Sequence, residues 1–148
     1  LKFHAHSGQW AYEAGGTGGG AAVTRDGGRT WHQPKAGLVK HYGVACAADP
    51  ERPEVWYASV ARGPGKAYGD GAEAYLYRAS GGADWQPIGW EPQPMGQMPL
   101  ALVTVLGRPG HLYAGTSSGQ VWLSTDYGDS WSRLPFNLGV VWLSMLVQ

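Results

Sequence analysis

The stretch "STDYGDSW", residues 124–131, places two aspartates, a glycine and several hydroxyl-bearing residues ahead of a tryptophan. Asp126 can accept hydrogen bonds from the backbone N–H groups that follow it, as aspartate does in short turns. Gly128 supplies a backbone conformation that other residues resist, and Trp131 can pack back over the hairpin. The pattern predicts a tight turn between two strands, with Asp129 exposed to solvent.

The same pattern occurs twice more. "TRDGGRTW" (24–31) repeats it with threonine as the first residue, and "RASGGADW" (78–85) keeps the glycine and tryptophan but has serine for the aspartate. Serine can do part of the capping but cannot replace a catalytic carboxylate, so the three turns are interpreted as structural. Their tryptophans are 54 and 46 residues apart, which is typical of four-stranded propeller blades. The residues assigned to the turns are Thr24, Asp26, Gly28, Trp31, Ser80, Gly82, Trp85, Ser124, Asp126, Gly128 and Trp131.

Strands of alternating apolar residues, separated by glycine-rich turns, precede each of these stretches. Apolar runs at 42–49, 99–107 and 140–147 are predicted to be innermost strands, and no useful length shows a helical period. The sequence thus predicts an all-β fold, a β-propeller portion of about three four-stranded blades. The predicted boundaries are about 1–36, 37–92 and 93–136 for the blades and 137–148 for an inner strand of a further or closing blade.

Composition supports this fold class and limits the partners. The 148 residues include 24 glycines, 8 tryptophans and 8 tyrosines, and 11 basic residues balance 11 acidic ones. A neutral chain gives no reason to expect nucleic acid or an anionic membrane, and no apolar run reaches the roughly 20 residues that span a bilayer. The single Cys46 is expected to be buried and cannot form an internal disulfide. The absence of a disulfide and of a signal-peptide pattern favours a cytoplasmic location.

The turn pattern resembles the Asp-box, or BNR, repeat, S-x-D-x-G-x-x-W. The last copy matches it fully and the first with one serine-to-threonine change. Families with this repeat include sialidases, xyloglucan-cleaving glycosidases, sortilin-type receptors and photosystem assembly factors. The chain looks most similar to bacterial "glycosyl hydrolase" BNR-repeat proteins. In such proteins the boxes lie at turns away from the central pocket, so the resemblance implies a propeller but no particular reaction.

Few residues of the sequence are candidates for a catalytic site. A resemblance to sialidases would imply an arginine triad, but the seven arginines are scattered along the chain. Ordinary glycosidases need two carboxylates that flank the scissile bond. The candidates outside the turns are Glu13, Asp70, Glu73 and Glu91. Asp70 and Glu73 lie in the longest loop, although a solvated insertion is the better explanation of that loop.

No cofactor is predicted, and the evidence for a metal is limited. His4 and His6 lie on the same face of a predicted strand, as two metal ligands can. No third ligand is close in sequence, although His41 at the start of a predicted inner strand could approach in space.

A ligand pocket in a propeller is expected where the inner strands start, near the central channel. The corresponding residues are His41, Tyr42, Gln97, Met98, Val141 and Trp142, with Arg62 on a nearby loop. Aromatic and methionine side chains there suit sugar rings or a peptide, and plain packing of the channel is the alternative.

Three blades do not close a propeller, which uses about 4 to 8. Either the chain is part of a longer propeller or two copies associate into six blades. The predicted function is a binding or scaffold module for carbohydrate or protein at the channel face. The alternative is a glycoside hydrolase-like enzyme, sialidase-like or xyloglucanase-like, with catalytic residues partly outside this chain.

Overall fold

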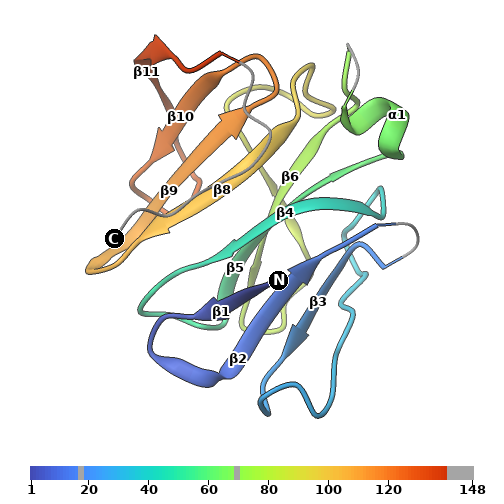
Figure 1. Cartoon of the computed structure of the whole chain (residues 1–148), viewed down its shortest axis with the longest axis vertical. Coiled ribbons are helices and arrows are strands. Elements are labelled where there is room, and N and C mark those ends of the chain that lie inside the picture. The colour runs from blue at the N-terminus through green and yellow to red at the C-terminus, as the bar shows by residue number, and fades with distance from the viewer. Residues whose placement is uncertain (17–18, 69–70, 140–148) are drawn as a thin grey trace.

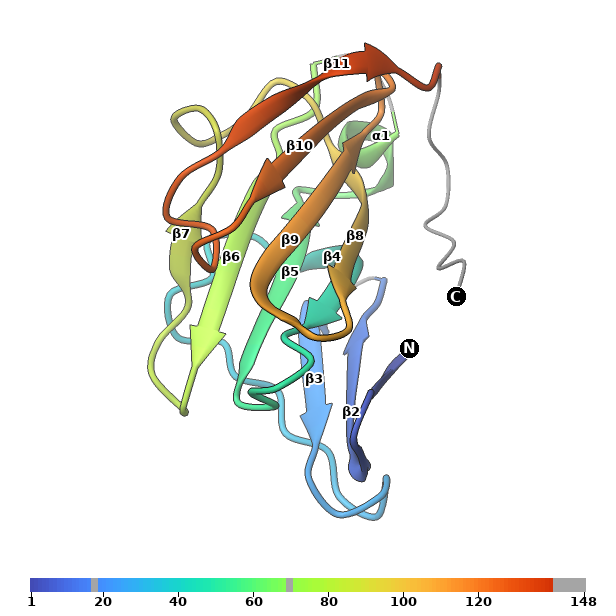
Figure 2. The same cartoon turned by 90° about the vertical axis from the view of Figure 1, so that its left-hand side faces the viewer.

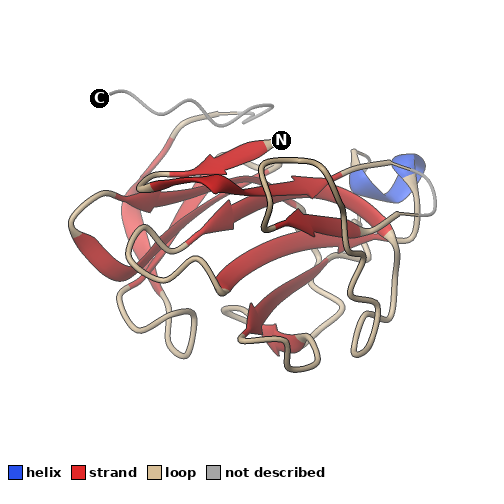
Figure 3. Cartoon of the chain, turned by 90° about the horizontal axis from the view of Figure 1, so that it is seen from below, coloured by secondary structure: helices blue, strands red, loops and turns tan. Residues whose placement is uncertain are grey.

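Three antiparallel sheets follow one another along the chain in a computed structural model that describes residues 1–16, 19–68 and 71–139. We number the sheets 1 to 3 in chain order. Sheet 1 is blue, sheet 2 is mainly green and sheet 3 is mainly orange in Figure 1, and sheet 2 lies between the other two. A view at right angles shows the same layers from the side (Figure 2). The only helix among the described residues is the short α1, Pro64–Ala67, so the predicted all-β class is confirmed (Figure 3). No helix in this part of the chain is long and apolar enough to cross a membrane.

Sheet 1 has the strand order β1-β2-β3. Its strands are β1 (Lys2–His4), β2 (Ser7–Ala14) and β3 (Ala21–Thr24). The fourth strand of the predicted blade is reduced to one bridge between Val23 and His32. The chain then turns to sheet 2, where Trp85 donates its backbone N–H to the Ala36 carbonyl (2.9 Å) and its indole N–H to the Pro34 carbonyl (2.7 Å). This segment therefore pairs with the next sheet instead of extending its own.

Sheet 2 has four strands in chain order, with β4 at its inner edge. The strands are β4 (Tyr42–Ala48), β5 (Val55–Ala61), β6 (Tyr75–Ser80) and β7 (Gln86–Ile88). All seven residues of β5 are buried, because both of its faces are covered. Gly43 lets β4 approach sheet 1 closely, since a Cβ there would lie 2.1 Å from the Gly20 carbonyl oxygen.

Sheet 3 also has four strands, in the order β8-β9-β10-β11. They are β8 (Pro99–Val105), β9 (Arg108–Thr116), β10 (Gln120–Ser124) and β11 (Ser132–Asn137). The innermost strands predicted at 42–49 and 99–107 correspond to β4 and β8. The third predicted inner strand, at 140–147, lies outside the described residues.

Two hydrophobic cores hold the three sheets together. Between sheets 1 and 2, Tyr12 packs on Trp56 (ring centroids 5.4 Å apart) and Trp56 on Trp85 (4.6 Å). Cys46 is buried in the same core. Between sheets 2 and 3, Tyr57 lies among aliphatic side chains of both sheets. Large aromatic side chains supply much apolar area per residue, which suits sheets that are only three or four strands wide.

Candidate functional site

The turn at residues 124–131 is closed by its own side chains. The Asp126 carboxylate accepts hydrogen bonds from the Ser124 hydroxyl (2.7 Å) and from the backbone N–H of Ser130 (2.9 Å). The Gly128 N–H donates to the Ser124 oxygen (2.8 Å), and the Trp131 indole donates to the Gly128 carbonyl (3.0 Å). Gly128 has a φ of 96°, which favours glycine.

The turn at residues 24–31 repeats this network. Asp26 accepts hydrogen bonds from the Thr24 hydroxyl (2.8 Å), the Thr30 N–H (2.9 Å) and the Thr30 hydroxyl (2.6 Å). The bonds from Thr30, and then that from Thr24, hold the pKa of Asp26 well below its usual value. Ser130 does the same for the pKa of Asp126. We call these two segments the aspartate turns. Both carboxylates are occupied in stabilising the turn, so neither is presented to a substrate.

The third turn lacks an aspartate and closes through the backbone. Gly81 and Gly82 have positive φ angles of 61° and 87°, and the Ala83 N–H donates to the Ser80 carbonyl (3.0 Å). Trp85 is buried against sheet 1, whereas Trp31 in the first turn is 40% exposed. The third turn therefore contributes its tryptophan to a core between sheets.

Asp49 is a buried carboxylate whose role the sequence did not reveal. It lies in the turn after β4 and has no exposed surface. One oxygen accepts the backbone N–H groups of Glu51 and Arg52 (both 3.1 Å), and the other accepts the N–H of Gly110 in sheet 3 (2.7 Å). His4 in sheet 1 lies 3.0 Å from its carbonyl oxygen through Nε2. Asp49 thus joins all three sheets.

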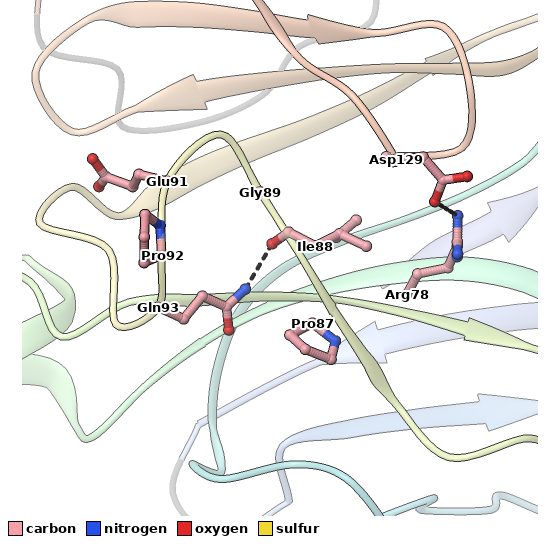
Figure 4. A pocket seen from close by; sticks show the side chains of 9 residues that line it. Arg78, Pro87, Ile88, Gly89, Glu91, Pro92, Gln93 and Asp129 are labelled. Carbon is pink, nitrogen blue, oxygen red and sulfur yellow. Dashed lines mark hydrogen bonds and ion pairs between the residues drawn. The ribbon is translucent and has the colours of Figure 1, made fainter.

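A pocket of about 520 Å³ lies between the end of sheet 2 and the second aspartate turn (Figure 4). Arg78 donates to Asp129 (2.8 Å) and to the Tyr127 carbonyl (2.9 Å), so Asp129 is exposed as expected but also joins two sheets. The Gln93 amide donates to the Ile88 carbonyl (2.6 Å). Glu91 and Asp129 lie on opposite sides of the pocket in Figure 4. Nothing in this arrangement resembles two carboxylates that face one bond.

Three of the predicted channel residues, His41, Tyr42 and Arg62, lie at one end of sheet 2. Tyr42 pairs with Ala61, so His41 and Arg62, both exposed, lie near each other. Tyr68 interacts with Tyr42 at this end of the sheet. Burial, and then this interaction, raise the pKa of Tyr68 above its usual value.

The remaining predicted site residues differ in accessibility. Met98 is fully buried in the core, so its side chain is not available to a ligand, and Gln97 accepts a hydrogen bond from the Ser118 hydroxyl (2.6 Å). Glu73 pairs with Lys66 (3.4 Å). Three of the predicted residues lie outside the described part of the chain: Asp70, Val141 and Trp142.

The two histidines proposed as metal ligands point to different partners. His4 is buried beside the Asp49 carbonyl, and Nε2 of His6 lies 3.6 Å from a carboxylate oxygen of Glu51. Among residues 1–16, 19–68 and 71–139, no group of three or more histidine, cysteine, aspartate or glutamate side chains is placed to hold a metal ion.

A groove of about 660 Å³ lies where the three inner strands come together, at the ends of β4 and β8. This is the opposite end of these strands from the predicted pocket. The lining residues are Lys2, Phe3, His4, Ala5, Ala47, Ala48, Pro50, Leu102, Val103, Thr104, Val105 and Leu106. Phe3 is 71% exposed and Leu106 64% exposed, whereas none of the described residues that line the groove is an aspartate or glutamate. The groove can therefore bind apolar groups but offers no carboxylate for acid–base chemistry.

Solved structures with a similar fold are β-propeller proteins. An ancestral GH74 enzyme is 18% identical, with a TM-score of 0.62 over 90% of this chain and 18% of its own. YCF48 bound to a D1 peptide is 19% identical, with a TM-score of 0.60 over 90% of this chain and 40% of its own. A GH74 xyloglucanase from Xanthomonas campestris is 25% identical, with a TM-score of 0.57 over 79% of this chain and 17% of its own.

Sequence comparison adds no family. No protein-family model and no curated protein matches the chain. The chain spans between 17% and 40% of the length of the three structures described above. Its three sheets therefore have the fold of part of a β-propeller.

Proposed function

We propose that this chain is a binding or scaffold segment of a β-propeller and that it holds a ligand in the groove at its inner strands. The observation that carries the proposal is a groove of about 660 Å³ with a largely apolar lining and no carboxylate among the described residues. Pockets of this size and character are typical of binding sites. The two aspartate turns, which we propose are Asp-box repeats, support the fold and leave the groove free.

Most of the described carboxylates elsewhere have other partners. Among the described residues, eight bind a neighbouring group through hydrogen bonds or ion pairs: Asp26, Asp49, Glu51, Glu54, Glu73, Glu91, Asp126 and Asp129. A glycosidase needs two carboxylates roughly 5 to 9.5 Å apart across a sugar-binding cleft. The groove offers none, which favours binding over hydrolysis.

An extended protein segment suits the groove better than a sugar. Within the described part of the chain, the inner strands β1, β4 and β8 each pair with a neighbour in their own sheet on one side only. An edge strand presents backbone N–H and C=O groups to an incoming extended peptide, and apolar pockets accept its alternate side chains. A peptide-bound structure of YCF48 is among the similar folds.

The test is a comparison of probes on the intact chain. We expect extended peptides with alternating apolar residues to bind, and xyloglucan oligosaccharides to bind less, as measured by calorimetry. Leu106→Asp in the groove should weaken peptide binding at least about tenfold, because it puts a charge against apolar groups. Leu138→Asp is the matched control, since Leu138 is equally exposed, at 64%, but does not line the groove.

Two outcomes would overturn the proposal. If neither probe binds, or if both variants behave like the wild type, the groove is not the binding site. Hydrolysis of xyloglucan by the chain would favour the second candidate, a glycoside hydrolase-like enzyme. The observation behind that candidate is the GH74 enzymes among the similar folds. In that case, loss of activity in Glu73→Gln would implicate the loop that also contains Asp70.

A further inference from the structure

Each of the first two sheets buries a tyrosine against the sheet that follows it. We call the side of a sheet that is turned toward the next sheet its forward face, and the other side its rear face. Tyr12 on β2 lies in the core between sheets 1 and 2, and its hydroxyl donates to the Pro53 carbonyl (2.6 Å). Tyr57 on β5 lies in the core between sheets 2 and 3. Both tyrosines are 0% exposed.

Sheet 3 carries the corresponding tyrosine on a face that no other described sheet covers. The sequences "WAYEA" (10–14), "VWYAS" (55–59) and "HLYAG" (111–115) place Tyr113 where the other two sheets have theirs. Leu112 and Ala114 point into the core with sheet 2, so Tyr113 between them points the other way, to the forward face. Tyr113 pairs with Val103 and Leu123, and all three side chains are partly exposed. This face has the composition of a contact between sheets.

Sheet 1 has a rear face of the kind that covers such a tyrosine. Ala11, next to the inward-facing Tyr12, lies on this face and is only 3% exposed, whereas its cross-strand partner Phe3 is 71% exposed. Glu13, farther along β2, is an exposed acid near the end of this strip. Interfaces between proteins commonly combine an apolar centre with a polar rim.

We propose that the forward face of sheet 3 binds the rear face of sheet 1 of a second copy of this chain. Under twofold symmetry the contact forms twice, so that both open faces of each copy are covered. The result is a ring of six sheets, within the range of about 4 to 8 that propellers use. The contact does not depend on what the groove binds, but it completes the groove, because the partner's β1 becomes the inner strand next to β8.

The symmetry of this contact gives a specific test by light scattering. Tyr113→Asp and Phe3→Asp should each raise the dimer dissociation constant by about 100-fold or more, because each places a charge in both contacts. An equal mixture of the two variants should form a dimer again, since the mixed dimer keeps one unaltered contact. Val39→Asp is the control, because Val39 is 60% exposed on the loop between sheets 1 and 2 and should leave the dimer unchanged.

Crosslinking tests the contact without a disruptive charge. A photoreactive benzophenone side chain in place of Tyr113, in a mixture of isotope-labelled and unlabelled chains, should crosslink to residues 1–24 of the other copy. A wild-type chain that stays monomeric at all concentrations would overturn the proposal. Crosslinks to another region would overturn it as well. So would an equal mixture of Tyr113→Asp and Phe3→Asp that stays monomeric while circular dichroism shows that both variants are folded.

Discussion

Asp49 and Asp126 are both aspartates near the end of a strand that accept backbone hydrogen bonds, yet they act over different distances. All the hydrogen bonds to the Asp126 side chain come from residues within four positions of it. Asp49 also binds nearby N–H groups, but its second oxygen reaches Gly110, 61 residues away. One carboxylate closes a turn, and the other fixes how two sheets meet.

The difference follows from burial. Asp126 lies at the surface, where water can replace much of what its turn loses. Asp49 has no exposed surface, and Gly110, which donates to its second oxygen, is buried as well, so this N–H has no access to water if the carboxylate is removed. A buried N–H without a partner costs about 1 to 3 kcal/mol. The turn at Asp126 is therefore a local element, whereas the Asp49 carboxylate is part of the packing between sheets.

The largest expected effect is that of Asp49→Ala. This change removes the acceptor of three backbone N–H groups, including the buried one of Gly110. We expect the free energy of unfolding to fall by about 3 kcal/mol or more. Urea denaturation followed by tryptophan fluorescence measures it.

Asp49→Asn is the comparison for Asp49→Ala, because the asparagine side chain has the same shape as aspartate and keeps one of its two oxygen acceptors. It should cost less than Asp49→Ala. If Asp49→Ala costs no more than the same change in an aspartate turn, then Asp49 does not join the sheets as described.

A smaller effect is expected for Asp126→Ala. The change removes hydrogen bonds from Ser124 and Ser130 but leaves the sheets in contact, so it should cost about 1 to 2 kcal/mol, as the loss of a capping side chain does. Asp84→Ala in the third turn, where the backbone closes the turn, is the control and should stay within about 0.5 kcal/mol of the wild type. Equal losses in the two variants would show that the carboxylate does not stabilise its turn.

Local patterns explain what the sequence predicted well. The spacing of aspartate, glycine and tryptophan, and the apolar runs at 42–49 and 99–107, depend on hydrogen bonds and side-chain alternation over a few residues. These features placed the strands of three sheets. They predicted four strands for sheet 1, which has three, because the segment after His32 pairs with Trp85 of the next sheet. No local pattern encodes that contact.

The contacts between sheets were the part that the sequence did not reveal. Asp49 was only the last residue of a predicted inner strand, and Asp129 was interpreted only as exposed, because their partners Gly110 and Arg78 are distant in sequence. Met98 was expected at the channel mouth, but the packing of sheet 3 on sheet 2 buries it. The groove likewise depends on where three inner strands meet, and it lies at the opposite ends of these strands from the predicted pocket, which stays a prediction.

The smallest effect concerns acid. Hydrogen bonds from Thr30 and Ser130 lower the pKa values of Asp26 and Asp126 from their ordinary value of 3.8. A carboxylate whose pKa is lower in the folded protein contributes stability above its unfolded pKa and loses that contribution as the pH falls through the folded pKa. The urea midpoint should therefore fall below about pH 4 less steeply in the double variant Asp26→Asn/Asp126→Asn than in the wild type. Asp84→Asn should follow the wild-type curve, and a double variant that does so too would show that the aspartate turns add nothing to the acid sensitivity of the fold.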